Sequence, residues 1–316
     1  SFTWIKKRSA SENHELQDAV RGATKRLASN TTDIETTVAG SISSFDSDGF
    51  TVVDAGTTNE NTFTYVAWNW KAGGSGSANS VGTISSTVSV NADAGFSIVK
   101  YTGDGTDAGS STVTVGHSLG KKPEFIITKK ITSGTDYGWS CWHKDLGAGY
   151  GIWLHLTNAR NAAMWDGDSN HSSTVFSPAD SAYNNVSSSD YINYLFTSVE
   201  GYSKFGTYEG NTSPNGPYVF TGFSVAWLMV KNIDHTGTNS DWVIHDNKRN
   251  PHNVADNHLE ANTSNAENGD GRPIDVDFLS NGFKIKTNGS YYENNNTNTY
   301  IYIAFAKTPF KYANAR

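Results

Sequence analysis

A pattern of aromatic and β-branched residues, with side chains for two faces, recurs three times along the chain. The last copy, residues 299–307, reads Thr-Tyr-Ile-Tyr-Ile-Ala-Phe-Ala-Lys and contains no glycine or proline, which predicts a buried strand. The other copies are residues 64–71 and 190–196. In each copy a tyrosine is followed five positions later by an aromatic residue: Tyr65 and Trp70, Tyr191 and Phe196, Tyr300 and Phe305. A recurring closing strand predicts a recurring module.

Further shared blocks precede each closing strand. Residues 45–50 and 278–283 place an Asp-Gly or Asn-Gly pair between apolar flanks, which predicts a hairpin. The second module has residues 175–178 at that place, without such a pair. Upstream, each module has an apolar strand that ends in a lysine: Lys6, Lys129 and Lys231. Because an acidic residue follows in the next block, each lysine is predicted to form an ion pair at the strand end. The alternative is that the lysine charge binds a ligand.

The repeats predict an all-β chain of tandem antiparallel β-sandwich domains, jelly-roll-like or immunoglobulin-like, joined by a Gly/Ser linker. The expected parts are a truncated first repeat at 1–72, a linker at 73–95, a second repeat at 96–201 and a third at 202–316. The first repeat begins at its lysine-ended strand and lacks the opening strands of the others, so we expect the chain to be a piece of a longer protein.

Two segments allow more than one interpretation. Residues 73–79 predict a flexible linker, whereas residues 83–90 alternate Ile or Val with Ser or Thr and predict an edge strand. Residues 12–28 place Leu16, Val20 and Leu27 among charges, which is compatible with a short helix. The corresponding blocks of the other modules are strand-like, so strand plus turn is preferred there.

Composition narrows the class of protein. Thirty Gly, nine Trp and only 17% charged residues in 316 suit a β protein with tight turns. A net charge of −7 disfavours non-specific binding to nucleic acid or anionic membranes, and no apolar run is long enough for a transmembrane helix. Cys141, the only cysteine, excludes an intrachain disulfide and a Cys-based zinc site, and its alternating surroundings predict a buried thiol.

The sequence contains only weak matches to known metal-binding motifs. The histidine candidates, His143 with His155, His252 with His258, and His245 with Asp246, lack zinc-site spacing. Residues 46–49 and 104–107 resemble fragments of oxygen-ligand loops, so Ca²⁺ stays open, but a hairpin turn already accounts for the first.

No nucleophile elbow or phosphate-binding glycine motif occurs in the sequence. Asp18, Asp145 and Asp246 fall in corresponding blocks, which favours a turn or cap over catalysis. We expect no enzyme activity and no cofactor.

Polar loops that carry aromatic residues favour carbohydrate binding. A sugar's apolar face can stack on an exposed ring while amides and carboxylates bond its hydroxyl groups. The candidate ligand-binding residues lie in or near such loops: Trp153, Trp165, Tyr183, Tyr291, Tyr292, Asn294 and Asn295.

Several motifs are shared with a known group of proteins: Trp4-Ile5-Lys6-Lys7, Asp18-Ala19-Val20-Arg21-Gly22, Tyr65-Val66-Ala67-Trp68, and residues 44–50, 116–123, 202–206 and 281–284. Together they resemble repeat-built virion proteins of tailed, especially marine, bacteriophages, usually labelled tail-fibre-like or lectin (laminin-G-like). The resemblance covers nearly the whole chain except the linker, and no catalytic residue is carried over. It implies a virion surface component that is a homotrimer.

The sequence hypothesis is therefore a non-enzymatic virion surface protein that binds host cell-surface glycan or receptor through its loops. One alternative is a purely structural virion protein, such as a head fibre, a capsid decoration or a tail appendage. A second alternative is a capsule polysaccharide depolymerase. The expected partners are other copies of the chain, other virion proteins and host glycan, with no nucleic acid and no membrane insertion.

Overall fold

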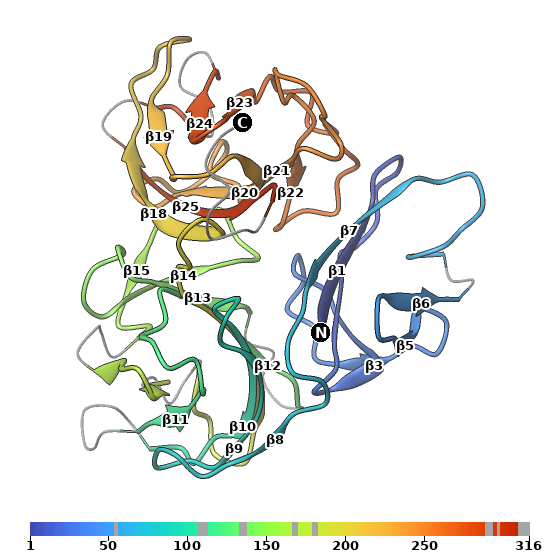
Figure 1. The fold of residues 1–316 in the computed structure, drawn as a ribbon, viewed down its shortest axis with the longest axis vertical. Helices are drawn as coiled ribbons and strands as arrows, with labels where there is room; N and C mark the ends of the chain where they lie inside the picture. Colours follow the sequence, from blue (N-terminus) through green and yellow to red (C-terminus); the bar gives the residue numbers. More distant parts are fainter. Residues whose placement is uncertain are drawn as a thin grey trace. The chain divides into compact units, whose positions relative to one another are not determined.

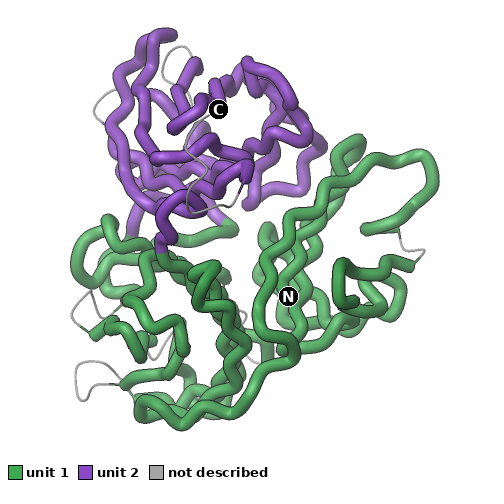
Figure 2. Tube along the Cα trace, viewed as in Figure 1, with its two compact units in different colours: residues 1–155, 161–197 green, residues 156–160, 198–316 purple. Residues whose placement is uncertain are grey.

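The computed structural model is built from antiparallel β-sheets (Figure 1). It describes residues 1–53, 56–106, 113–132, 138–165, 170–178, 183–287, 293–295 and 298–308. No α-helix occurs in these ranges, and hence no helix that could cross a membrane. The chain divides into unit 1, residues 1–155 with 161–197, and unit 2, residues 156–160 with 198–316 (Figure 2).

The first module of unit 1 has a five-stranded sheet and a hairpin. The sheet order is β4 (Thr36–Thr37), β3 (Gly22–Leu27), β2 (Glu15–Asp18), β1 (Phe2–Lys7) and β7 (Tyr65–Trp70). The hairpin is β5 (Ile42–Phe45) with β6 (Phe50–Val52). Strand plus turn, rather than a helix, is therefore confirmed for residues 12–28, and the Asp-Gly hairpin is confirmed as well.

The second module of unit 1, from residue 73, has an eight-stranded sheet. The order is β15 (Asn161–Ala162), β14 (Tyr150–Trp153), β13 (Ser140–His143), β12 (Phe125–Lys130), β17 (Asp190–Phe196), β10 (Phe96–Thr102), β9 (Ser86–Asn91) and β8 (Ser77–Asn79). The short pair β11 (Val115–Gly116) and β16 (Val175–Phe176) lies over its core.

The predicted Gly/Ser linker is wrong. Residues 77–79 form β8 and residues 86–91 form β9, and both belong to the second module's sheet. β9 is not the edge strand that the sequence predicted for residues 83–90, because it pairs with β10 on one side and β8 on the other. The edge strand of the sheet is β8. Small side chains suit this place: a Cβ at Gly73 would approach the Val90 carbonyl oxygen to 2.8 Å.

The third module, in unit 2, is a two-layer sandwich. One layer has the order β18 (Ser203–Glu209), β25 (Thr299–Ala306), β20 (Val225–Asn232), β21 (Val243–Asp246) and β22 (Leu259–Glu260). The other has the order β19 (Tyr218–Phe220), β24 (Gly282–Ile285) and β23 (Val276–Leu279). Buried residues of both layers, such as Leu228, Tyr302, Val219 and Phe283, share one core.

Strand register confirms the repeat. The aromatic residue that ends each closing strand pairs with the first aromatic of the lysine-ended strand: Trp70 with Phe2, Phe196 with Phe125, Phe305 with Trp227. The three tyrosines likewise pair five positions further along those strands. The same pairing in three places means that one supersecondary unit has been copied along the chain.

The lysines at the strand ends are buried, and each donates a hydrogen bond to a backbone carbonyl group. Each Nζ donates to the carbonyl of the next residue: Lys6 to Lys7 at 2.8 Å, Lys129 to Lys130 at 3.1 Å, and Lys231 to Asn232 at 2.8 Å. Lys129 also donates to the Thr32 carbonyl at 2.9 Å, and Lys231 to the Thr157 carbonyl at 3.3 Å. Burial lowers the pKa of Lys231 to about 7.

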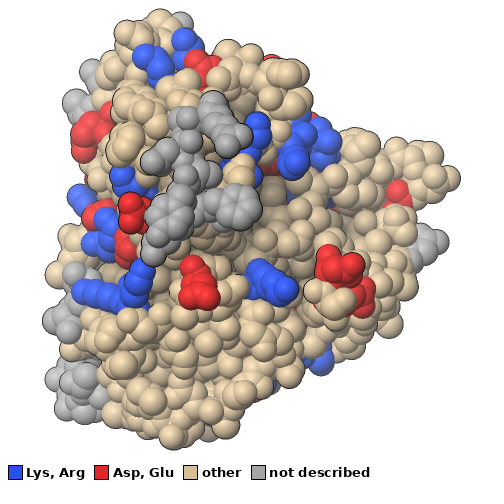
Figure 3. All heavy atoms as spheres, in the orientation of Figure 1, with Lys and Arg blue, Asp and Glu red and all other residues tan. Residues whose placement is uncertain are grey.

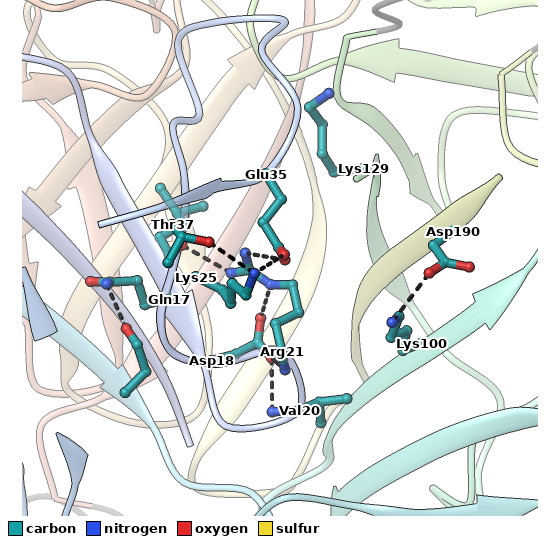
Figure 4. Close-up of polar contacts among 12 residues, drawn as sticks. Gln17, Asp18, Val20, Arg21, Lys25, Glu35, Thr37, Lys100, Lys129 and Asp190 are labelled. Carbon is teal, nitrogen blue, oxygen red and sulfur yellow. Dashed lines mark hydrogen bonds and ion pairs between the residues drawn. The ribbon is translucent and has the colours of Figure 1, made fainter. Parts of the chain in front are cut away.

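The recurring aspartate is a structural cap, as the sequence indicated. Asp18 Oδ1 accepts the backbone N–H groups of Val20 and Arg21, and Asp18 Oδ2 accepts from Arg21 Nε at 2.5 Å (Figure 4). Asp246 and Arg249 repeat this arrangement in the third module. Asp145 does not correspond to them, because strand register places His143 at that position.

The first and second modules pack into one body through the outer faces of their sheets. Phe2 stacks on Tyr194 with ring centroids 4.1 Å apart, and Tyr194 Oη donates to Asp18 Oδ2 at 2.8 Å. Trp139 Nε1 donates to the Ala28 carbonyl at 2.8 Å. Both modules therefore belong to a single compact unit, whereas the sequence predicted separate domains.

Candidate functional site

The outer face of the three-stranded sheet carries two exposed aromatic rings. Tyr218 is 46% exposed and Phe220 is 56% exposed, while Val219 between them is buried in the core. Alternation along β19 places both rings on the same side of the sheet. The other large apolar side chains exposed in the described part of the chain are Val81, Leu156 and Val254, which lie far from one another in sequence.

Neighbouring strands complete this surface, which we call the aromatic face. In β24, Lys284 lies opposite Tyr218, and Gly282 lies opposite Phe220. In β23, Asp277 lies opposite Lys284, and Leu279 lies opposite Gly282. The aromatic face therefore consists of Tyr218, Phe220, Gly282, Lys284, Asp277 and Leu279. Gly282 has no side chain to stand beside the Phe220 ring, and a Cβ there would overlap the Val219 carbonyl oxygen.

Hydrogen bonds fix the Tyr218 side chain and the backbone at Phe220. Tyr218 Oη donates to Asn281 Oδ1 at 2.9 Å, in the turn that joins β23 and β24. Lys204 Nζ donates to the Phe220 carbonyl at 2.8 Å and lies 5.3 Å from the centroid of the Phe220 ring. Lys284 Nζ donates to Asn215 Oδ1 at 2.5 Å. The Tyr218 ring is thus held by its hydroxyl group, and ammonium and amide groups flank both rings.

This geometry suits the recognition of a flat ligand with an apolar side and a polar rim. Exposed apolar patches with polar surroundings mark interaction sites. The face of the molecule shown in Figure 3 has acidic and basic side chains scattered among uncharged ones. Only 17% of the residues in the chain are charged. Stacking and hydrogen bonding should therefore contribute more to ligand recognition by the aromatic face than long-range charge attraction.

Two of the residues that the sequence proposed for ligand binding lie inside their modules. Trp165 is buried and its Nε1 donates to Ser140 Oγ at 2.9 Å. Asn294 is buried and its Nδ2 donates to the Ser213 and Thr287 carbonyls at 2.7 and 2.9 Å. Neither presents an exposed surface, because both side chains complete hydrogen bonds inside their modules; this corrects the expectation that they lie in exposed loops.

The remaining candidates differ among themselves. Trp153 and Tyr183 are half-buried, and their rings meet edge to face with centroids 5.0 Å apart. Asn295 is half-buried and its backbone N–H donates to Tyr300 Oη at 2.8 Å. Tyr291 and Tyr292 lie outside the described residues. Ligand binding by Trp153, Tyr183 and Asn295 stays a prediction.

Sequence reasoning missed Tyr218 and Phe220. The signal was the short alternation Tyr218-Val219-Phe220 directly after Pro217, which is typical of an edge strand with one aromatic side. Aligning the repeats did not reveal this alternation, because the second module has no matching pair of aromatic residues at the corresponding position.

A buried group of titratable side chains is the other notable cluster of unit 2. One ligand atom each from His258, Glu260 and Asp270 lies within 4.8 Å of the others, so these residues could converge on a metal ion. His258 Nε2 and Asp270 Oδ1 are 3.0 Å apart, and Thr263 and Asn265 donate to Glu260 Oε2 at 2.9 and 3.2 Å. Burial, and then the nearby Asp241 carboxylate, raise the pKa of Glu260. Of the sequence candidates for metal binding, His258 alone takes part.

The acidic turns considered for calcium already serve the fold. Asp46 accepts hydrogen bonds from Ser44 Oγ and Thr51 Oγ1 at 2.9 and 2.8 Å, across its hairpin. Asp104 Oδ1 accepts from Thr106 N and Asn185 Nδ2 at 2.8 and 2.7 Å. Asp107 lies outside the described residues.

An open cleft of about 440 Å³ lies along β8 and β9 in unit 1. Its lining consists of glycine, alanine, serine and valine residues with one asparagine. Such a surface offers few groups for specific recognition, so the aromatic face is the stronger candidate.

Comparisons with known proteins add a family but no activity. Searches of curated proteins and of solved structures returned no match. A family model described as a domain of unknown function, DUF7483, matches residues 1–309. The chain therefore belongs to the DUF7483 family.

Proposed function

We propose that this protein is a non-enzymatic surface protein of a bacteriophage virion that binds host cell-surface glycan through the aromatic face of its third module. The observation that carries the glycan proposal is the pair of exposed rings, Tyr218 and Phe220, on one strand of the three-stranded sheet. The virion location rests on the sequence resemblance alone.

Physical chemistry supports a carbohydrate ligand for this face. A pyranose ring presents C–H groups on one side, which pack against an aromatic ring, and hydroxyl groups at its rim. Asn281, Lys284 and Asp277 supply acceptors and donors around the two rings. Because the Tyr218 hydroxyl group is already held by its hydrogen bond to Asn281, that ring loses little side-chain entropy when a ligand stacks on it.

A glycan array with purified protein, followed by calorimetry on the best ligand, tests the proposal. Tyr218→Ala and Phe220→Ala should each weaken binding by about tenfold, equivalent to about 1.4 kcal/mol. Val81→Ala is the matched control, because it removes an exposed apolar side chain in unit 1. Binding that is unchanged in the Tyr218→Ala/Phe220→Ala double variant would exclude this face. No binding to any glycan or host envelope would exclude the function.

A structural role in the virion is the second candidate, and the same rings favour it. Exposed aromatic side chains are also enriched in protein–protein interfaces. In that case the aromatic face would contact another virion protein or another copy of the chain. Crosslinking of intact particles, with copy number by mass spectrometry, distinguishes the two: dozens of copies on the shell with crosslinks at Lys284 or Lys204 would favour the structural role.

A further inference from the structure

One imidazole and two carboxyl groups of unit 2 converge beside the edge strand of its five-stranded sheet. Glu260 ends β22, which pairs only with β21 among the described residues (Figure 1). His258 precedes β22 directly, and residues two apart on an extended chain point to the same side. Asp270 comes from the irregular segment 261–275, which returns to this edge. One ligand atom from each of the three residues, which we call the trio, lies within 4.8 Å of the others.

The spacing within the trio suits a single small metal ion. Ligand atoms that lie about 2.0 Å from a tetrahedral ion are about 3.3 Å from one another. His258 Nε2 and Asp270 Oδ1 are 3.0 Å apart, and a hydrogen bond links the carboxyl groups of Glu260 and Asp270. A separation of a few tenths of an ångström more, about 0.3 Å, would therefore let one ion replace these hydrogen bonds.

Neighbouring groups hold the carboxyl groups of the trio from outside. Thr263 Oγ1 and Asn265 Nδ2 donate to Glu260 Oε2 at 2.9 and 3.2 Å. The backbone N–H of Arg272 donates to Asp270 Oδ1 at 3.1 Å. Outer hydrogen bonds of this kind orient metal ligands and tune their affinity. The trio is therefore positioned by contacts that a bound ion would leave in place.

The charge balance around the trio favours a cation. A third carboxyl group, that of Asp241, lies near those of Glu260 and Asp270, and the cationic side chains that act on Asp241 are Lys231 and Arg272. A histidine that binds a metal ion is neutral, so three carboxylates would face two cations. Burying this excess of negative charge is costly without a counterion. A bound cation would supply that counterion, and the alternative is a proton held between Glu260 and Asp270.

Unsatisfied polar atoms lie in and beside the trio. The His258 side chain is only 2% exposed, and its Nδ1 has no hydrogen-bond partner in the described part of the chain. The His245 ring lies next to it, with ring centroids 6.4 Å apart, and His245 Nε2 is 3.2 Å from Glu293 Oε1. Both of these side chains are fully buried, and His245 Nδ1 and Glu293 Oε2 likewise have no partner among the described residues. Native proteins leave few such atoms unsatisfied, and a bound ion with its water accounts for them.

We propose that the trio binds one divalent transition-metal ion, with Zn²⁺ preferred over Ca²⁺ and Mg²⁺. The imidazole nitrogen of His258 gives this preference, because Ca²⁺ and Mg²⁺ favour sites made of oxygen atoms. Three protein ligands leave a fourth position for water. Asp270 is the partly exposed member of the trio and gives the ion its way in. The ion ties the segment that carries Asp270 to the sheet edge, a role that goes beyond glycan binding and does not depend on it.

Calorimetry with zinc chloride on the chelator-treated full chain tests the proposal. One Zn²⁺ per chain should bind with a Kd of about 1 μM or lower, and calcium and magnesium chloride should bind at least about a hundredfold more weakly. Asp270→Asn keeps an acceptor for the Arg272 N–H but loses the charge, and should weaken Zn²⁺ binding at least about a hundredfold. Asp145→Asn, beside His143 in unit 1, is the matched control and should bind like the parent protein. Unchanged affinity in Asp270→Asn, or no Zn²⁺ binding below about 100 μM, would overturn the proposal in favour of the shared proton.

Residue-resolved hydrogen exchange locates the ion on the unmodified chain. Zn²⁺ should slow exchange of the backbone amides in residues 258–272, because the ion joins the two ends of this segment. Thr263→Val removes an outer donor to Glu260 and should weaken Zn²⁺ binding by about tenfold. If Asp270→Asn fails to fold, the exchange experiment still decides. Zn²⁺ binding that slows exchange only outside residues 258–272 would overturn the proposal.

Discussion

Charged and polar side chains buried in the modules shape how stability responds to pH. Glu15 is fully buried in β2, with Arg26 Nε at 2.9 Å from its Oε1. Burial raises the pKa of Glu15 from 4.5 to about 7, against the opposing attraction of Arg26. A carboxyl group with a raised pKa stabilises the folded state while it is protonated in both states. That stability is lost as pH rises from the unfolded value toward the folded one.

Replacing Glu15 by glutamine should remove this pH dependence. Between pH 4.5 and 7 the free energy of unfolding of the parent protein should fall by about 3 kcal/mol more than that of Glu15→Gln. Urea denaturation at several pH values, followed in the unit 1 transition, measures the difference. Glu200→Gln, at an exposed position, should follow the parent curve. Parallel curves for the parent and Glu15→Gln would contradict the assignment.

At the scale of elements, one repeated strand face is used for different contacts. The outward aromatics Phe2 and Tyr194 join two modules. The Asp18–Arg21 cap is part of the same contact, because Arg21 Nη2 donates to Tyr194 Oη at 3.2 Å while Tyr194 Oη donates to Asp18 Oδ2. Burial raises the pKa of Tyr194, so the hydroxyl keeps its proton and stays a donor. A motif that caps a turn locally thus also anchors a module.

Tyr194→Phe should destabilise unit 1 by about 1–3 kcal/mol, because it leaves buried polar groups of Asp18 and Arg21 with one partner fewer. The ring that stacks on Phe2 is retained, so the change isolates the hydroxyl group. Thermal and urea unfolding measure the effect. Tyr218→Phe removes an exposed hydroxyl group and should change stability by less than about 0.5 kcal/mol. Equal effects of the two variants would refute the anchoring role.

Long alternating strands were predictable, and small or exceptional elements were not. The closing strands and the Asp-Gly and Asn-Gly hairpins follow from aromatic alternation and turn chemistry. β8 was missed because Ser77-Ala78-Asn79 has no large side chain. These residues form a strand because their backbone pairs with β9, and a sequence does not show that pairing. The burial of the strand-end lysines could not be predicted, because a sequence shows a charge but not the carbonyl groups that surround it. Tyr218 and Phe220 were missed because three residues carry little periodicity.

At the scale of the molecule, the repeats have diverged in what they leave exposed. The third module presents aromatic rings on its small sheet, and in the first module β7 pairs on one side only among the described residues. The second module has the broadest sheet, with β8 and β9 beyond its opening strand. The copies of one supersecondary unit therefore differ in the surfaces that they leave exposed.

Cys141 offers a direct test of cooperativity in unit 1. It is the only cysteine in the chain and lies fully buried in β13, which pairs with β12 and β14. Burial raises the pKa of its thiol, and the reactive form is the thiolate, so alkylation requires the sheet to open. Iodoacetamide labelling of the native protein should be at least about a thousandfold slower than labelling in urea.

Variants should separate opening of unit 1 from events elsewhere in the chain. Tyr194→Phe should accelerate labelling of Cys141, because it weakens the contact between the first and second modules. Phe220→Ala should leave the rate unchanged, because that ring is exposed in unit 2. Mass spectrometry of timed samples gives the rates. Labelling of the native parent protein at the denatured rate would show that the eight-stranded sheet opens locally, and unit 1 would then not unfold as one cooperative body.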